Sequence, residues 1–126
     1  MRLRSPGLAI LLGACAVAPP ASAPGPLTEL GGRVAGVPQR CISLNPADAL
    51  RTAENDRHVL FYGSGRTIWV NRLGPACGFG RDDILVIEPM GSSLCRGDLV
   101  RSVDRYSRIP GPACVLGDFV AFSRPR

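Results

Sequence analysis

The chain has 126 residues, which allows one domain, and its formal net charge of +5 comes from fifteen arginines and no lysine, set against ten acidic residues. Without lysine, the protein cannot use a P-loop lysine, a Schiff-base lysine or a Ser-Lys dyad. The arginines are scattered among the acidic residues and form no basic stripe. We therefore expect no nucleic-acid partner, because phosphate neutralisation requires clustered positive charge.

The first fifteen residues have the features of a bacterial secretory signal. Arg2 and Arg4 precede an apolar run, residues 8–17, that is too short to cross a bilayer. Within this run, Leu12-Gly13-Ala14-Cys15 resembles the lipobox of bacterial lipoproteins, in which the Cys is diacylated and becomes the new N-terminus. We predict a lipoprotein signal peptide over residues 1–15 and lipidation, as with palmitate, at Cys15.

A second interpretation of the signal places the cleavage after Ala23, and Cys15 would then be an incidental apolar residue. Pro24 would hinder that cleavage, so we favour the lipoprotein interpretation. Two or more acyl chains anchor a protein stably to a membrane where one does not. Because Ala16 rather than Asp follows the Cys, as in similar lipoproteins of the outer membrane, we expect a periplasmic protein on the inner leaflet of that membrane.

Residues 16–38 are rich in Ala, Pro and Gly, and they offer little apolar surface to bury. We predict an extended tether there. The single folded domain is expected over residues 39–123, and a domain of this size commonly needs cross-links to be stable.

The folded part alternates between short apolar runs and turn signals. Residues 47–53 could begin with one helical turn, but we favour a strand over 50–53. The apolar run at 84–88 is typical of a strand buried on both faces. Turn signals recur about every ten residues, so we predict an all-β fold, a small antiparallel β-sandwich or barrel of about six to seven strands. The expected strands cover residues 39–44, 50–53, 58–62, 67–73, 84–88, 99–104 and 115–122.

Residues 58–73 predict a β-hairpin, in which two β-branched and aromatic runs flank a Gly-Ser-Gly-Arg loop at 63–66. With that loop, Tyr62 pairs with Thr67. Because side chains alternate along a strand, the hairpin then has two faces. We expect a core face made of Val59, Phe61, Ile68 and Val70, and a second face made of His58, Leu60, Tyr62, Trp69 and Asn71.

The second face of the hairpin is the predicted binding site. His58, Tyr62, Trp69 and Asn71 present apolar bodies with hydrogen-bonding tips, which suit an envelope protein, a peptide or a glycan. The alternative is that another strand covers this face and Trp69 belongs to the core.

Four cysteines follow the signal, and an even number in an exported domain of this size predicts two disulfides. Zinc binding is disfavoured, because no pair of cysteines has close ligand spacing and the chain has one His. Three connectivities are possible, and we favour Cys41 with Cys114 and Cys77 with Cys95.

Three acidic residues, Asp82, Asp98 and Asp118, follow a Cys and a Gly at short spacing. We interpret them as turn residues, because Asp bonds nearby main-chain amides. A shared cation site is the alternative, but no contiguous calcium-loop pattern is present. We expect no metal and no cofactor.

Several short motifs carry a family resemblance over about residues 40–122. Together they are similar to a family of small uncharacterised lipoproteins and exported proteins of proteobacteria. The resemblance implies an exported single domain and lends no catalytic residue. The motifs are Arg-Cys-Ile at 40–42, Asp-Arg-x-x-Leu-Phe at 56–61, Trp-Val-Asn-Arg-Leu at 69–73, Leu-Cys-x-Gly-Asp at 94–98 and Cys-x-Leu-Gly-Asp-Phe at 114–119.

A hydrolase with a Ser or Cys nucleophile would have to use His58 as its base, since the chain has no other His. No Gly-x-Ser-x-Gly nucleophile motif is present. We therefore expect a non-catalytic binding or structural module, anchored to the membrane through Cys15, that serves an envelope component or a protein partner. A small periplasmic hydrolase using His58 is the alternative.

Overall fold

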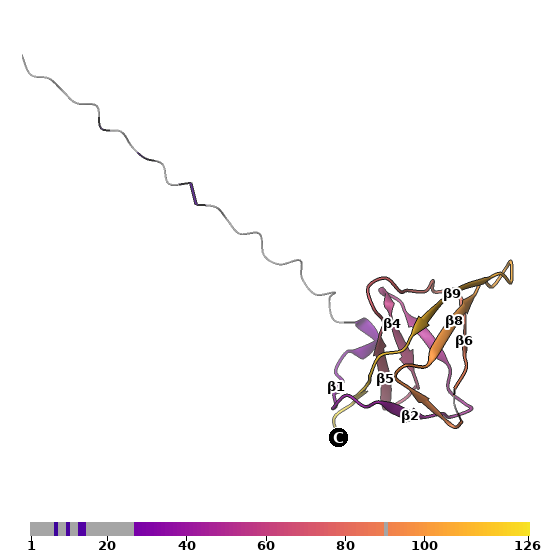
Figure 1. Cartoon of the computed structure of the whole chain (residues 1–126). Helices are drawn as coiled ribbons and strands as arrows, with labels where there is room; N and C mark the ends of the chain where they lie inside the picture. The colour runs from indigo at the N-terminus through magenta and orange to yellow at the C-terminus, as the bar shows by residue number, and fades with distance from the viewer. Residues whose placement is uncertain (1–6, 8–9, 11–12, 15–26, 90) are drawn as a thin grey trace, which may run out of the picture.

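The structure is a computed structural model that describes residues 7, 10, 13–14, 27–89 and 91–126 (Figure 1). The predicted signal cleavage and the lipidation site at Cys15 lie outside these residues. No helix in the described part is long and apolar enough to cross a membrane.

The described chain is all-β, and each pair of neighbouring strands is antiparallel. The predicted fold class and the presence of two disulfides are thereby confirmed. Of the ten strands in the described residues, seven have four or more residues. The elements are η1 (Thr28–Leu30), β1 (Val34–Ala35), β2 (Cys41–Ser43), β3 (Leu50–Ala53), β4 (Asp56–Tyr62), β5 (Thr67–Arg72), β6 (Ile84–Ile87), β7 (Ser93–Cys95), β8 (Leu99–Val103), β9 (Pro110–Val115) and β10 (Phe119–Ser123).

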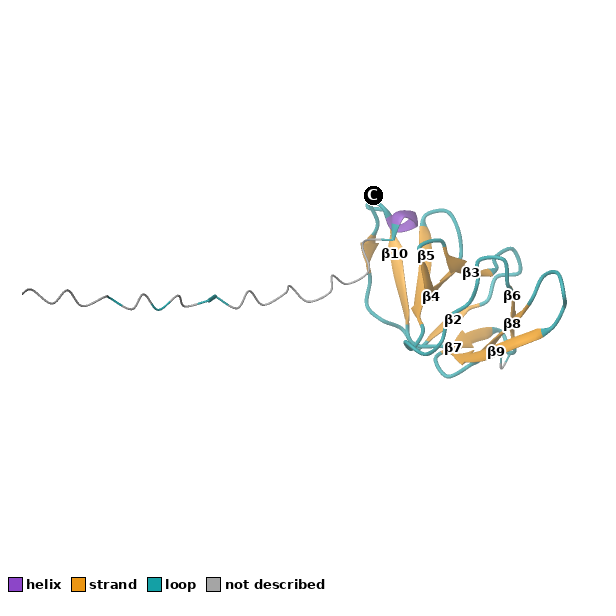
Figure 2. Ribbon diagram, turned by 90° about the horizontal axis from the view of Figure 1, so that it is seen from above, coloured by secondary structure: helices purple, strands orange, loops and turns teal. Residues whose placement is uncertain are grey.

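The strands form three sheets. The largest has the order β1-β10-β5-β4-β3, and the smaller ones have the orders β6-β8-β9 and β2-β7. The five-stranded sheet lies on one side of the domain and the two smaller sheets on the other (Figure 2). The strands β3 and β6 are therefore edges of different sheets.

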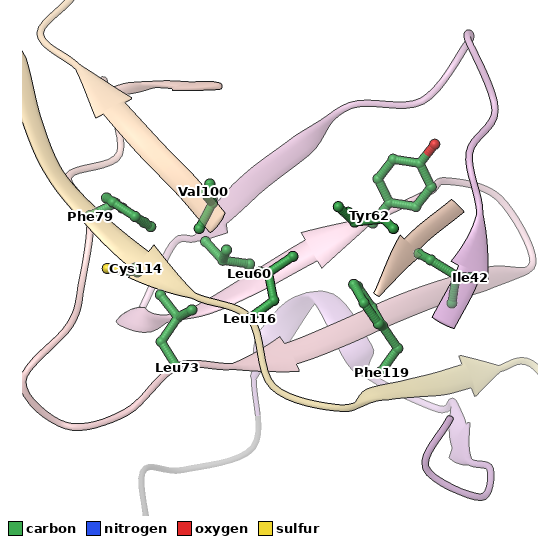
Figure 3. Close-up of a cluster of buried hydrophobic side chains, with 10 residues drawn as sticks. Ile42, Leu60, Tyr62, Leu73, Phe79, Val100, Cys114, Leu116 and Phe119 are labelled. Atoms are coloured by element: carbon green, nitrogen blue, oxygen red, sulfur yellow. The ribbon is translucent and has the colours of Figure 1, made fainter. Parts of the chain in front are cut away.

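The main core lies where the two sides meet (Figure 3). Leu60 and Phe119 of the five-stranded sheet pack there with Val100 of β8, and all three are fully buried. Burial of one such side chain stabilises the fold by about 1.5–3 kcal/mol. The remaining buried members are Ile42, Tyr62, Leu73, Phe79, Leu94, Cys114 and Leu116.

A second core covers the opposite face of the five-stranded sheet. It contains the predicted core face of the hairpin, Val59, Phe61, Ile68 and Val70, so that prediction is confirmed. Leu27, which precedes η1, and Leu30, the last residue of η1, pack onto the same cluster. Together with the pairing of β1 with β10, this packing makes residues 27–38 part of the folded domain, which corrects the predicted boundary at residue 39.

The hairpin of β4 and β5 forms with a register that differs from the predicted one by two residues. Tyr62 pairs with Trp69 instead of Thr67. Thr67 instead pairs with Ser123 of β10, and their side-chain oxygens lie 2.9 Å apart. Gly63 and Gly65 adopt positive φ angles in the longer loop. Because an even shift keeps each side chain on its face, the two predicted faces remain correct.

The predicted disulfide connectivity is wrong. The bonds join Cys41 to Cys95 and Cys77 to Cys114. Cys41 of β2 lies directly opposite Cys95 of β7 in the ladder, with their Cα atoms 4.0 Å apart. The buried Cys114 of β9 reaches Cys77 in the loop that follows β5.

Strand β6 is not buried on both faces, contrary to the prediction. Within the described residues it pairs with β8 alone. Leu85 and Ile87 pack inward, whereas Ile84 and Val86 are 37% and 40% exposed. A continuous apolar run is thus compatible with an edge strand that has one covered face.

Candidate functional site

A cleft of about 490 Å³ lies between the edges of the two main sheets, beside β3 and β6. Its lining is mainly apolar, with a few convergent polar residues, which is typical of ligand sites. The apolar side chains come from Leu44, Leu50, Tyr62, Leu85 and Ile87, and the polar ones from Asn45, Asp48 and Ser92.

Register and alternation place the cleft side chains. Leu50 of β3 lies opposite Tyr62 of β4, so both side chains stand on the same face of the five-stranded sheet. Leu85 and Ile87 are two residues apart on β6, and they share its inward face. The two sheet edges thus supply opposite walls of the cleft.

The loop that closes one end of the cleft is held by Asn45. Its side-chain oxygen accepts a hydrogen bond from the Ala47 amide at 3.0 Å, and its carbonyl accepts one from the Asp48 amide at 3.0 Å. The chain therefore turns at Asn45 and Pro46, and this turn directs it into β3.

Tyr62 lines the cleft with its ring and fixes this loop with its hydroxyl group. The hydroxyl accepts a hydrogen bond from the Asn45 amide at 2.7 Å and donates one to the Asn45 carbonyl at 3.0 Å. Because both interactions are internal and Tyr62 is buried, its hydroxyl group positions the loop and is not available to a ligand.

The other predicted binding residues do not form one exposed patch with Tyr62. Trp69 is half-buried against the main core, beside Tyr62. Asn71 is fully buried, and its side chain donates to the Gly117 carbonyl at 2.8 Å and accepts from the Gly117 amide at 2.9 Å. The second face of the hairpin is thus largely covered by the other sheets, which was the alternative considered from the sequence.

The His58 ring is half-buried, and its Nδ1 lies 2.6 Å from the Cys77 carbonyl oxygen. The nearby Asp56 carboxylate accepts a hydrogen bond from the main-chain amide of His58 at 2.9 Å. Within the described part of the chain, no hydrogen bond joins the ring to a hydroxyl, thiol or carboxylate group. The His58 ring is therefore hydrogen-bonded to a main-chain carbonyl group and not to a nucleophile.

Two of the acidic residues that follow the cysteines have partners in the described structure, one within its own turn and one in a neighbouring turn. Asp98 accepts a hydrogen bond from the Cys95 amide at 2.7 Å, and Asp118 forms an exposed ion pair with Arg96 at 3.5 Å. Residues 27–89 and 91–126 place no three His, Cys, Asp or Glu side chains where they could share a metal ion.

No family model, curated protein or solved structure matches this chain. The resemblance to small exported proteins of proteobacteria therefore stays a prediction. The cleft residues Leu44, Leu50, Leu85 and Ile87 were missed in the sequence because the alternation on each strand gives no information about which two edges face each other.

Proposed function

We propose that this protein is a non-catalytic binding module, anchored by lipid at Cys15 in the periplasm, whose cleft holds an apolar segment of an envelope protein partner. The lipobox-like motif and the two disulfides, which suit an oxidising compartment, support the location. The cleft between β3 and β6 is the observation that carries the binding role.

An extended peptide is the form of partner that best suits this cleft. In an antiparallel edge strand, alternate residues direct their N–H and C=O groups away from the sheet. In the described chain β6 pairs with β8 on one side, so its other side is available to an added strand. Strand addition supplies affinity through the main chain, and a pocket for alternate side chains supplies specificity.

The charges around β6 indicate what should flank the apolar part of that peptide. Asp82 and Asp83 precede the strand, Glu88 follows it in an exposed ion pair with Arg101, and Asp48 lines the cleft. A second copy of β6, added in the antiparallel direction about its centre, would place Asp83 opposite Glu88, which is unfavourable. A partner with basic residues at both ends of an apolar segment is complementary to these acids.

The other functions considered from the sequence have less support. A glycan platform needs exposed aromatic faces, and Tyr62 is 3% exposed. A hydrolase would need a nucleophile beside His58, but the ring of His58 is hydrogen-bonded to the Cys77 carbonyl group.

Calorimetric titration of the full chain with a synthetic peptide tests the binding role. The peptide has apolar residues at alternate positions and a Lys or Arg at each end, and the fluorescence of Trp69 gives a second readout because it lies beside Tyr62. Ile87→Ser should weaken binding about tenfold or more, because a buried Ile side chain contributes about 1.5–3 kcal/mol. Ile84→Ser is the matched control, since Ile84 lies on the outer face of the same strand.

Two further peptides separate the parts of the proposal. N-methylation at alternate residues should abolish binding if the main chain pairs with β6, and replacing the basic ends by Glu should weaken it. Equal affinities of Ile87→Ser and Ile84→Ser would contradict the assignment of the cleft as the binding site. If no peptide bound, the proposal of a peptide-like partner would be contradicted.

Mass spectrometry of the mature protein tests the anchor. We expect diacylated Cys15 at the N-terminus and loss of acylation in Cys15→Ser. An unmodified protein that begins after Ala23 would contradict the proposed anchoring.

A further inference from the structure

Three arginines from distant parts of the chain converge at one end of the five-stranded sheet. Arg33, Arg66 and Arg124 line a hollow of about 500 Å³, together with Gly65 and Pro125. This hollow is separate from the cleft between β3 and β6, with which it shares no lining residue.

The strand register brings the three arginines together. Arg33 precedes β1 and Arg66 precedes β5, while Arg124 follows β10. β10 lies between β1 and β5 in the sheet, and its Ser123 pairs with Val34 on one side and Thr67 on the other. The three side chains therefore start from neighbouring positions.

Main-chain carbonyl groups orient the guanidinium groups. Arg33 Nη1 donates to the Arg66 carbonyl at 3.1 Å, and Arg66 Nη2 donates to the Arg124 carbonyl at 3.2 Å. The Arg124 amide donates back to the Arg66 carbonyl at 3.1 Å. Each guanidinium has five N–H groups, so most remain free for a ligand.

The hollow lacks a counter-charge within the described residues. The ion pairs of the described residues involve Arg51, Arg96 and Arg101, and none includes an arginine of the hollow. Arg33 Nε is buried and has no hydrogen-bond partner in the described structure. Buried N–H groups are normally paired, so the described residues leave one donor of this arginine unsatisfied.

We propose that Arg33, Arg66 and Arg124 form a binding site for a phosphate group. Guanidinium forks match the oxygens of phosphate in pairs, and three of them complement its negative charge. The phosphate can be free in solution or belong to a lipid headgroup. The hollow lies close to η1, because the Arg33 amide donates to the carbonyl of Leu30, the last residue of that helix, at 3.0 Å. The predicted lipid anchor precedes η1 in the chain, so a lipid headgroup is tested beside free phosphate.

Binding of inorganic phosphate to the full chain, measured by calorimetry and by the thermal midpoint at constant ionic strength, tests this site. Phosphate should raise the midpoint of the wild type. Arg124→Gln should weaken binding at least about tenfold, because a hydrogen bond to a charged group contributes about 1.5–3 kcal/mol. Arg40→Gln is the matched control, because it removes the same charge at the end of the sheet where Gln39 pairs with Phe119, and it should bind like the wild type.

Arg33→Gln should weaken binding similarly. If this variant fails to fold because Arg33 is partly buried, Arg124→Gln decides the question, since Arg124 is exposed and lies beyond the last strand.

A second ligand distinguishes the two sources of phosphate. Glycerophosphoglycerol, the soluble headgroup of phosphatidylglycerol, should bind more tightly than inorganic phosphate if the site recognises lipid, and more weakly if it recognises free phosphate. The proposal is overturned if neither ligand binds, or if Arg124→Gln and Arg40→Gln have equal affinities.

Discussion

The five-stranded sheet and the sheet of β6, β8 and β9 are built from the same kinds of residue, but they are covered differently. The five-stranded sheet buries Leu60 toward the main core and Phe61 toward the second core, so both of its faces are packed. In β8, Val100 is fully buried, whereas its neighbour Leu99 and the cross-strand partner Val115 are 37% and 57% exposed. Apolar composition makes a strand, and the neighbouring elements decide how many of its faces become core.

This difference divides stability and recognition between the two sheets. The doubly covered sheet loses the most packing when it opens, so it should determine global stability. The singly covered sheet loses less packing when it opens, and regions with few buried contacts open first. It also contains β6, the edge to which we assign the binding of a partner strand.

Truncation of one apolar side chain in each sheet gives the largest expected contrast. Phe61→Ala should lower the free energy of unfolding by about 3–5 kcal/mol, because the ring is fully buried and its loss leaves a cavity. Val115→Ala, on the exposed face of the other sheet, should change it by no more than about 0.5 kcal/mol. Urea denaturation measures both, and similar losses would mean that a partner of some kind already covers Val115.

Removal of the disulfide between Cys77 and Cys114 should affect the two sheets unequally. The bond closes a loop with a sequence separation of 37 residues, and its loss should cost about 2–4 kcal/mol. In the double variant Cys77→Ala, Cys114→Ala, amide hydrogen exchange should become faster than in the wild type. The increase should be larger in β8 and β9 than in β4 and β5.

The other disulfide is the matched control. Cys41→Ala with Cys95→Ala should speed exchange first in β2 and β7, which that bond joins. If both double variants raised exchange equally in every strand, the sheets would open as one unit and the comparison would fail.

Asn71 links the two sides of the molecule and should have an intermediate effect. Its side chain satisfies both main-chain groups of Gly117, in the turn between β9 and β10, from a fully buried position on β5. Asn71→Ala should therefore cost about 1–3 kcal/mol, because it leaves those groups unpaired. Asn55→Ala is the control, since it removes one exposed hydrogen bond to Thr28 and should have little effect on the urea midpoint.

Local patterns in the sequence predicted the parts of the fold that depend on alternation. The composition of the two hairpin faces was correct, although the register was wrong by two residues, because parity alone determines a face. The register depended on β10. Its Ser123 pairs with Thr67, more than fifty residues away in the sequence, and such a distant pairing leaves no local signal. The predicted strand over residues 115–122 likewise contains a break at Gly117, which Asn71 stabilises.

The features that were missed depend on which elements meet in space. Nothing near Cys41 indicates that β2 pairs with β7, so the connectivity could not be derived. Leu27 and Leu30 have helical spacing, but the prolines around them are typical of a tether. The cleft is the strongest case, since Leu50 and Ile87 become opposite walls when two sheet edges face each other.

The smallest expected effect concerns Asp104 at the turn between β8 and β9. Its carboxylate accepts hydrogen bonds from the Ser107 amide at 2.8 Å, the Tyr106 amide at 2.9 Å and the Ser107 hydroxyl at 3.0 Å. These bonds, that of the Ser107 amide first, hold the pKa of Asp104 below its ordinary value of 3.8.

A lowered pKa in the folded state means that the carboxylate stabilises the turn fully at pH values above 3.8, and that this contribution is lost as the pH falls through the lowered pKa. We expect the protection of the Tyr106 and Ser107 amides against hydrogen exchange to fall over that acid range, while β4 and β5 keep theirs. Asp104→Asn should remove the pH dependence, because the amide side chain does not titrate. A loss of protection that spread through β4 and β5 at the same pH would show that the hairpin of β8 and β9 and the doubly covered sheet unfold together, which contradicts the difference drawn between them.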